Sequence, residues 1–247
     1  MNLLVLTYHY FDRGEPAGIK PEDYEFSMPA DRFAAHGRQL QESAYRIIPP
    51  EVLTSLPQET LDDRPQVLVT IDDGHASVAE IAFDILMEQR ILPVVSVITD
   101  RVGQENYMDW GALRHLAAAG CSIQSHSKSH RDLTRLRPDE LVVELEDSKK
   151  IIEDNIGLPV ATLTIPMGRM DKKVAAAAIE AGYKIVMTSF TGINRSADDL
   201  ASLRRFQVKR SRAILPLDDY FRAGSMIRLA GAAKNVIRKI RDENRLW

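Results

Sequence analysis

The stretch Val67-Leu68-Val69-Thr70-Ile71-Asp72-Asp73-Gly74-His75 is an apolar run that ends in two carboxylates, a glycine and a histidine. Its apolar residues do not alternate with polar ones, which is typical of a parallel strand covered by helices on both faces. In α/β sheets and barrels, ligands bind at the carboxyl ends of such strands. The stretch therefore predicts an α/β fold with a site near Asp72 and Asp73. A simple Asp-Gly turn is the other interpretation of this stretch taken alone.

A second polar segment, some fifty residues further on, supports a metal site. Adjacent carboxylates repel each other unless a cation or a shared proton relieves the repulsion. Ser125-His126-Ser127-Lys128-Ser129-His130 follows a short apolar strand expected at Cys121–Ile123, and its two imidazoles are four residues apart. Imidazole and carboxylate ligands suit zinc and similar divalent ions, and catalytic sites keep a position open for water. A His-x-x-x-His pair is weak by itself, but together with the two aspartates it indicates a metal centre.

These two segments resemble motifs of the polysaccharide deacetylase family, the metal-dependent carbohydrate esterases (carbohydrate esterase family 4) that share the NodB homology domain. Residues 70–74 are similar to the family's T-F-D-D-G motif, and residues 125–133 to its S-H-(S/T)-x-x-H-x-x-L motif. The resemblance implies a distorted, incomplete (β/α) barrel with Asp72 as general base. It also implies that Asp73, His126 and His130 hold the metal, with zinc as first choice and nickel, cobalt, manganese or iron as alternatives.

A third segment, Leu163-Thr164-Ile165-Pro166-Met167-Gly168, is similar to the family's P-Y-G segment. That similarity implies that Pro166 and Gly168 line a substrate groove. Two departures stand out. Thr164 occupies the place where many members have an arginine that orients the base, and Met167 replaces the usual aromatic residue.

The expected general acid is a histidine near the N-terminus. The family's usual acid lies in a late Leu-x-His motif, but this chain has no histidine after His130. Some members are circularly rearranged so that the acid-bearing strand opens the domain, and Thr7-Tyr8-His9-Tyr10 resembles that branch. The resemblance implies that His9 is the acid; a histidine without chemistry at a strand end is the other interpretation. His75 is the competitor, which we interpret as a groove residue.

Trp110 resembles a tryptophan that flanks the groove in the family, although an anchor in the core is an equally good interpretation. Three other segments are interpreted as structural. Residues Glu144-Leu145-Glu146-Asp147, on a helix expected over 138–155, are assigned to a solvated face, and the basic run Arg204–Arg210 to a strand. Residues Phe11–Pro29, rich in glycine, proline and charge, are expected to form a surface loop.

Length and composition bound the organisation and the partners. A chain of 247 residues with 45% hydrophobic content fits one domain, which we expect to comprise a barrel over 1–215 and a helical extension over 216–247. The net charge of −3 and the isoelectric point near 6.1 argue against nucleic acid as a partner.

The ends of the chain lead to an expectation about location. Residues 1–9 lack the basic region and the cleavage site of a signal peptide, which predicts a cytoplasmic protein. Residues 226–245 have the pattern of a helix with an apolar face and a basic flank. Packing of this helix on the barrel is one interpretation. Peripheral contact with anionic lipid at the inner membrane surface is the other.

The resulting prediction is a hydrolase that removes an N-acyl group, N-acetyl above all, from an amino sugar of a polysaccharide or glycan precursor. One rival keeps the hydrolase but changes the substrate to a small non-sugar amide or to a formamido sugar on a lipid carrier. The other rival is a glycan-binding protein of the same fold with degraded catalysis.

Overall fold

The computed structural model describes residues 2–16, 18–49, 51–52, 65–195, 197–211 and 216–222. The basic segment expected to form a helix over 226–245 lies outside the described residues. The division into a barrel over 1–215 and an extension over 216–247 therefore stays a prediction.

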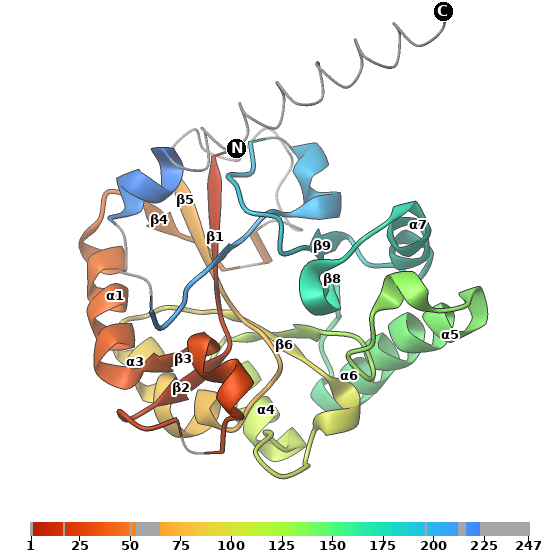
Figure 1. Cartoon of the computed structure of the whole chain (residues 1–247), viewed down its shortest axis with the longest axis horizontal. Helices are drawn as coiled ribbons and strands as arrows, with labels where there is room; N and C mark the ends of the chain where they lie inside the picture. The colour runs from red at the N-terminus through yellow and green to blue at the C-terminus, as the bar shows by residue number, and fades with distance from the viewer. Residues whose placement is uncertain are drawn as a thin grey trace, which may run out of the picture.

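An eight-stranded sheet forms the centre of the molecule (Figure 1). Its strands are β1 (Leu3–Tyr8), β4 (Arg46–Ile47), β5 (Gln66–Ile71), β6 (Val94–Val97), β7 (Ser122–Ser125), β8 (Thr162–Thr164), β9 (Ile185–Met187) and β10 (Phe206–Gln207). The order is β10-β1-β5-β6-β7-β8-β9, with β4 also paired to β5, and every pairing is parallel. The two end strands, β9 and β10, do not pair with each other in the described structure; Met187 of β9 forms an isolated bridge with Leu203, which lies shortly before β10. The expected incomplete (β/α) barrel is confirmed.

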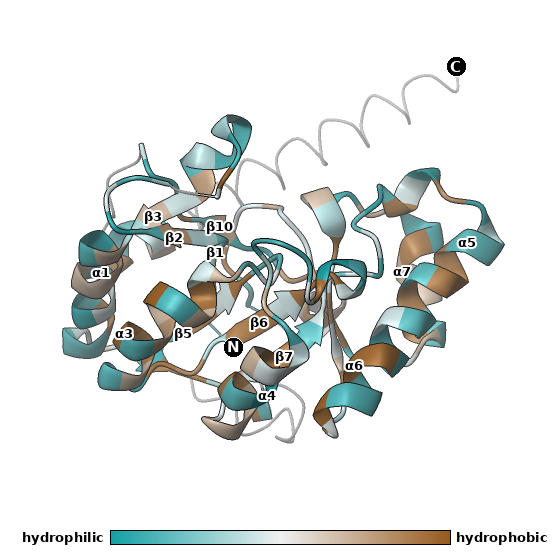
Figure 2. Ribbon diagram, turned by 90° about the horizontal axis from the view of Figure 1, so that it is seen from below, coloured by the Kyte–Doolittle hydropathy of each residue, from teal (hydrophilic) through white to brown (hydrophobic). Residues whose placement is uncertain are grey.

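Helices surround this sheet, as expected for parallel strands that are buried on both faces (Figure 1). They are α1 (Ala30–Glu42), α3 (Phe83–Glu88), α4 (Trp110–Ala118), α5 (Pro138–Val142), α6 (Ser148–Ile156) and α7 (Lys172–Glu180). Figure 2 shows apolar and hydrophilic residues side by side along these helices, so each has a face that can pack and a face that can meet water.

Shorter helical turns connect these elements. The 3₁₀ turns are η1 (Pro21–Phe26), η4 (Thr99–Arg101), η5 (Leu133–Arg135), η7 (Pro166–Gly168) and η8 (Ala197–Ser202). Two turns are π-helical, η3 (Val78–Ala82) before α3 and η6 (Val143–Asp147) between α5 and α6.

Alternation along the strands places Asp72 at the mouth of the barrel. On β5, Val67 and Val69 pack in a large apolar cluster together with helix residues, whereas Leu68 packs in a smaller cluster. The smaller cluster collects residues of β1, β5, β6 and β9, so it fills the inside of the barrel. Because successive side chains point to opposite faces, Thr70 and then Asp72 follow Leu68 on the inner side.

The segment expected to be a surface loop, 11–29, is more ordered and more buried than its composition indicates. It contains two short strands that pair in parallel, β2 (Tyr10–Asp12) and β3 (Ser27–Pro29). Phe11 and Met28 are buried at 2% and 1% exposure. Asp12 is also buried, and it accepts hydrogen bonds from Ser27 and Arg210. The composition does not predict this because Arg210 lies far from Asp12 in the sequence, and because the pairing of β2 with β3 brings Ser27 beside Asp12.

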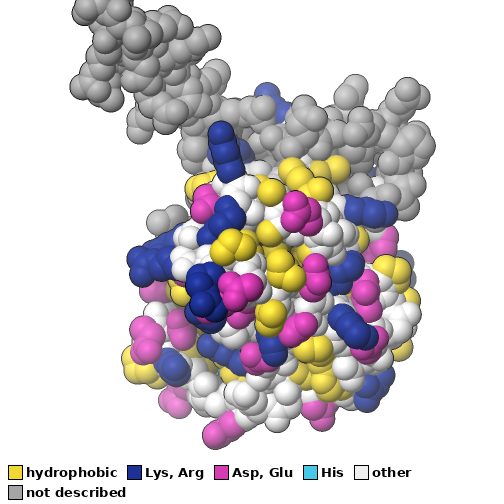
Figure 3. Space-filling view, turned by 90° about the vertical axis from the view of Figure 1, so that its right-hand side faces the viewer, with side chains coloured by type: hydrophobic (Ala, Val, Ile, Leu, Met, Phe, Trp, Pro, Cys, Tyr) yellow, Lys and Arg dark blue, Asp and Glu magenta, His cyan; other side chains and the backbone are white. Residues whose placement is uncertain are grey.

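The surface that includes α5 and α7 carries interspersed acidic and basic side chains (Figure 3). Several of them form ion pairs, such as Arg131 with Glu140 and Lys150 with Asp154. This face therefore presents no continuous basic area. Among the described helices, none is long and apolar enough to cross a membrane.

Candidate metal and catalytic site

A cavity of about 700 Å³ opens at the carboxyl ends of the strands, where the sequence predicts the site. It is lined mainly by polar and aromatic side chains. Those that carry the chemistry below are His9, Tyr10, Asp23, Phe26, Asp72, Asp73, His75, Tyr107, His126, His130, Met167 and Arg205.

The structure brings together Asp73, His126 and His130, with one ligand atom of each within 4.8 Å of the others. Asp73 Oδ1 lies 3.4 Å from His126 Nε2 and 3.7 Å from His130 Nε2. Asp73 follows β5, whereas both histidines follow β7, so neighbouring parts of the sheet converge here. One carboxylate and two imidazoles are a ligand set that zinc and related divalent ions accept.

The remaining polar atoms of two of these residues are engaged by neighbours in the way that metal ligands require. His126 Nδ1 donates to the backbone oxygen of Thr164 at 2.8 Å, which leaves Nε2 free to face Asp73. The hydroxyl of Tyr10 donates to Asp73 Oδ2 at 2.6 Å, which fixes the carboxylate. The residues therefore fit a divalent ion.

The electrostatics of the cluster agree with this fit. Burial and the nearby His126 lower the pKa of His130 to about 4, so its imidazole is neutral at pH 7, as ligation requires. Burial opposes ionisation of Asp73, but His126 and the other neighbouring imidazoles outweigh it and hold the pKa of Asp73 well below the ordinary value. Burial and Asp73 together raise the pKa of Tyr10, which keeps that hydroxyl a donor.

Asp72 is held by an arginine that sequence reasoning missed. Arg205 Nη1 lies 3.0 Å from Asp72 Oδ1 and 2.9 Å from Oδ2, and both side chains are 2% exposed. Arg205 Nε donates to the backbone oxygen of Thr188 at 2.8 Å. The interpretation of 204–210 as purely structural is therefore incomplete. Thr164 is uncharged and cannot form an ion pair with Asp72. Arg205, just before β10, forms that ion pair instead.

His9 faces the same carboxylate from the other side. It follows β1, which pairs with β5, and its Nε2 lies 4.0 Å from Asp72 Oδ2. Its Nδ1 is buried without a hydrogen-bond partner in the part of the chain that the structure describes. Burial lowers the pKa of His9 more than the aspartates nearby raise it, so the imidazole is neutral near pH 7.

His75 lines the cavity as expected, and its Nδ1 lies 2.9 Å from Ser77 Oγ. Trp110 is not among the lining residues, because it packs against the apolar core at the start of α4. The expectation that Trp110 flanks the groove therefore gives way to the alternative, an anchor in the core.

Pro166 and Gly168, which the resemblance assigns to the groove, are buried and do not line the cavity. Gly168 packs so closely that a Cβ there would come within 2.4 Å of the backbone nitrogen of Ser189. Met167 between them is the exposed residue, at 54%, and its φ of 57° turns it towards the cavity.

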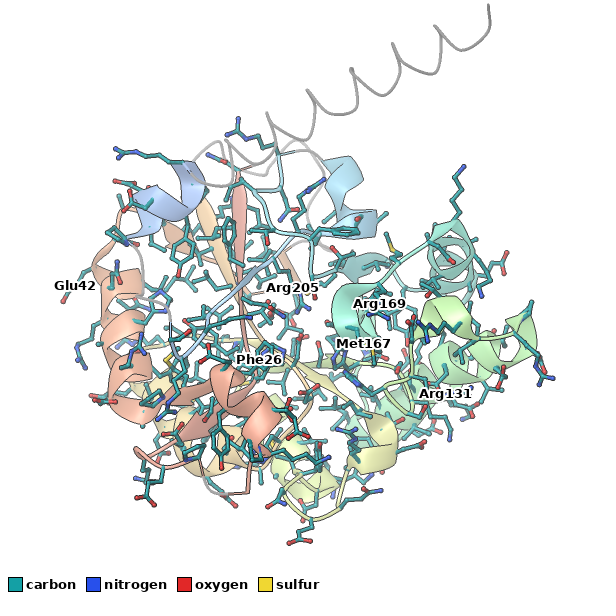
Figure 4. The ribbon with its side chains drawn as sticks, viewed as in Figure 1. Phe26, Glu42, Arg131, Met167, Arg169 and Arg205 are labelled. Atoms are coloured by element: carbon teal, nitrogen blue, oxygen red, sulfur yellow. The ribbon has the colours of Figure 1, made fainter. Side chains whose placement is uncertain are left out.

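Aromatic side chains do line the cavity, but they come from elsewhere. Phe26 ends η1 and its ring centroid lies 4.9 Å from that of His9. Tyr10 and Tyr107 lie on either side of His75 in edge-to-face contact, with ring centroids 5.1 Å and 6.0 Å away. Figure 4 shows Phe26 and Met167 on separate elements with the side chain of Arg205 near the barrel centre. The only signal in the sequence for the position of Phe26 is the aromatic content of residues 21–26.

Comparisons with known proteins agree with this geometry. A family model described as polysaccharide deacetylase matches residues 61–186, about half of the chain. The chain belongs to the polysaccharide deacetylase family. It is 25% identical over 207 residues to YxkH of Bacillus subtilis (strain 168), whose name places it in that family; the match spans 83% of this chain and 71% of YxkH. It is 32% identical over 124 residues to chitin deacetylase 1 of Cryptococcus neoformans var. grubii, spanning 50% of this chain and 26% of that relative.

Solved structures show the same fold. The deacetylase PplD of Streptococcus pyogenes, solved in complex with acetate, has a TM-score of 0.80 at 23% identity, covering 90% of this chain and 98% of that one. A de-N-acetylase from Aggregatibacter actinomycetemcomitans has a TM-score of 0.77 at 16% identity, covering 90% and 100% of the two chains.

Proposed function

We propose that the protein is a metal-dependent hydrolase that removes an N-acyl group, most simply N-acetyl, from an amino sugar of a polysaccharide or glycan precursor. The observation that carries this proposal is the arrangement in one cavity of a ligand cluster, Asp73 with His126 and His130, beside a carboxylate and an imidazole that are not part of it. Family membership and the name of the chitin deacetylase relative support the substrate class.

The ligand cluster would hold a divalent ion, with zinc as our first choice. Such an ion polarises an amide carbonyl and lowers the pKa of a water from about 15.7 towards ~7.

Asp72 and His9 would then move the protons. Asp72, oriented by Arg205, accepts the proton of the attacking water, because its carboxylate is held by the arginine and not by the ligand cluster. His9, whose imidazole is neutral in the resting site, would first take up a proton and then pass it to the leaving amine nitrogen, which is a poor leaving group unless protonated. The 4.0 Å between His9 Nε2 and Asp72 Oδ2 puts both groups beside the same reacting centre.

The proposal includes the rearranged branch of the family, in which the acid-bearing strand opens the domain. Its support is the position of β1, which lies between β10 and β5 and delivers His9 to the cavity. The alternative of a degraded, glycan-binding protein rests on the departures at Thr164 and Met167. The first of these carries less weight, because Arg205 forms the ion pair with Asp72 that a threonine at position 164 cannot form.

The test separates base from ligand. His126→Ala and Asp73→Asn should lose the divalent metal, because each supplies one of three ligands. Asp72→Asn should keep the metal yet lose activity by a factor of about 10² to 10⁴, the usual contribution of a general base. Metal content by elemental analysis and turnover on N-acetylglucosamine oligomers are the measurements. Equal metal loss in both aspartate variants would contradict the assignment of roles.

The same preparation decides between substrates. Release of acetate from the oligomers supports the proposal. Activity confined to formamido sugars on a lipid carrier or to small non-sugar amides would favour the rival substrate, and full metal loading without hydrolysis of any substrate would favour the binding protein.

A further inference from the structure

Glu144 is a buried acid that binds the loop between the two histidines of the metal cluster. Its exposure is 4%, so the expected solvated face of residues 144–147 is wrong for Glu144 and Leu145, whereas Glu146 and Asp147 are exposed. Glu144 Oε2 accepts the backbone N–H groups of Lys128 at 3.0 Å and Ser129 at 2.9 Å. Oε1 accepts the hydroxyl of Ser129. Lys128 directs its ammonium to Asp100 instead, so Glu144 is held by the loop's hydrogen bonds and not by that cation.

The loop needs such support because its backbone is strained. Ser127 and His130 both have φ of 63°, in the left-handed region that residues other than glycine rarely occupy. Such conformations persist only where the surroundings enforce them. Ser127 Oγ accepts the His130 N–H at 3.1 Å inside the loop, and the amide of Asp100 donates to the Lys128 oxygen at 2.9 Å from outside. From η6, on the opposite side of the loop, Glu144 accepts the backbone amides of Lys128 and Ser129.

The position of Glu144 is tied to the strand that carries His126. Glu144 belongs to the π-helical turn η6, and such turns are frequent at functional sites. At the start of the following α6, Ser148 Oγ lies 2.8 Å from Ser125 Oγ at the end of β7. The helix and the strand end are therefore fixed to one another, with the loop between them.

We infer that Glu144 is a positioning residue for the metal site: it holds the loop from His126 to His130 in the conformation that directs both imidazoles at Asp73, and so raises the affinity for the ion. The inference rests on the proposed metal-dependent function. Among the described residues, the hydrogen bonds of the Glu144 side chain go to Lys128 and Ser129 and not to a metal ligand, so it acts through the loop. Residues that orient metal ligands from outside typically account for 10- to 100-fold in metal affinity.

The experiment measures the dissociation constant for Zn²⁺ by competition with a chelator at neutral pH. Glu144→Ala should bind Zn²⁺ about 10- to 100-fold more weakly than the unmodified protein. Glu144→Gln should recover most of the affinity, because the amide oxygen can accept both N–H groups and the amide nitrogen can donate to Ser129. Glu146→Ala, at an exposed glutamate two residues further on, is the matched control and should bind normally.

A second measurement needs no metal. In the metal-free protein, hydrogen exchange at the Lys128 and Ser129 amides should be slow, and it should speed up in Glu144→Ala but not in Glu144→Gln. If Glu144→Ala does not fold, Ser129→Ala removes one of the bonds and should weaken Zn²⁺ binding in the same direction.

Unchanged Zn²⁺ affinity in Glu144→Ala would overturn the inference. Equal weakening by Ala and Gln would overturn it as well, since the charge and not the hydrogen bonding would then be at work. Failure of the unmodified protein to bind Zn²⁺ would overturn the proposed metal site itself.

Discussion

Asp72 has two nitrogen-bearing neighbours, the guanidinium of Arg205 and the imidazole of His9. Arg205 Nη1, 2.9 Å away, carries a permanent positive charge and keeps the carboxylate in place. His9 Nε2, 4.0 Å away on the other side, is an imidazole that can gain and lose a proton. The two groups come from opposite ends of the chain, and only the folded barrel puts them on one carboxylate.

The first prediction at this scale concerns His9. His9→Ala should lower turnover on an N-acetyl sugar severely and flatten the alkaline limb of the pH–rate profile, since that limb reports loss of the acid's proton and should lie below pH 6.5 because burial lowers the pKa of His9. Hydrolysis of an activated ester should be largely spared, because its leaving group needs no protonation. His75→Ala is the comparison variant. If it produces this signature and His9→Ala does not, the acid is His75.

The second prediction concerns His36, a buried histidine on α1 outside the site. Its Nδ1 is hydrogen-bonded to the hydroxyl of Tyr8, and its Nε2 has no hydrogen-bond partner in the described chain. Burial, with a smaller effect of Arg32, lowers the pKa of His36 from 6.5 to about 4. The unfolded chain therefore binds this proton more readily than the folded one, so stability is complete above pH 6.5 and falls as the pH drops towards 4.

Between pH 6.5 and about 4, His36 should lower the free energy of unfolding by about 3 kcal/mol, because each pKa unit corresponds to about 1.4 kcal/mol. Urea denaturation at a series of pH values measures it. His36→Gln should flatten this part of the profile, whereas His115→Gln, at an exposed histidine of α4, should leave the slope as it is. An unaltered slope in His36→Gln would show that other groups cause the acid sensitivity.

At the scale of elements, Arg205 joins strands that the incomplete barrel leaves unpaired. It lies just before β10, yet it donates to the backbone oxygen of Thr188, directly after β9, and to Asp72, after β5. The side chain therefore links the two ends of the sheet, β9 and β10. In the described structure these two strands are not paired with each other.

This link predicts strong coupling between Arg205 and Asp72. Arg205→Met should lower the free energy of unfolding by about 3–5 kcal/mol, the usual cost of leaving a buried charge without its partner. Combining it with Asp72→Asn should cost less than the sum of the two single changes, by about 1 kcal/mol or more. Denaturation of the metal-free variants provides the values, and Arg204→Met serves as control. Additive effects would mean that the pair is not a unit.

Some elements could be predicted from the sequence and others could not, for a physical reason. The run at 67–71 predicts its strand because a strand buried on both faces must be apolar throughout, whatever it contacts. The motifs around Asp73, His126 and His130 predict a cluster, because strand ends meet at one edge of a parallel sheet.

The other parts depend on partners that the sequence does not name. Glu144 and Arg205 look like ordinary surface charges until the loop at 128–129 and Asp72 are placed beside them. The packing of Trp110 against the core, and the burial of Pro166 and Gly168, likewise depend on distant segments, so similarity to groove residues did not predict that they lie outside the cavity lining.

At the scale of the whole molecule, charge is distributed unevenly along the chain. Between Arg222 and Trp247 the sequence has seven Lys or Arg and two acids, a local charge of +5, which leaves −8 for the rest. We propose that this segment brings the protein to anionic lipid at the cytoplasmic face of a membrane, near lipid-tethered glycan precursors.

The corresponding prediction is salt-sensitive binding to vesicles. Each Lys or Arg close to an anionic surface contributes about 1 kcal/mol, so a few engaged residues give measurable binding. Co-sedimentation with anionic vesicles is expected at low salt, with none on neutral vesicles. High salt, or replacement of Lys234, Arg238 and Arg241 by Gln, should abolish it. Absence of binding at low salt would favour packing of this segment on the barrel.

The pairing of β1 with β10 has a consequence for how the protein is made. Leu6 lies beside Phe206, so β1 leaves the ribosome long before β10, the strand that covers one of its edges. Asp72 likewise emerges long before Arg205. The growing chain therefore has an exposed edge on β1 and an acid without its arginine partner. The edge is covered and the acid is paired only after β10 and Arg205 have been synthesised. We therefore expect a chain that ends before Arg205 to be inactive and prone to aggregate.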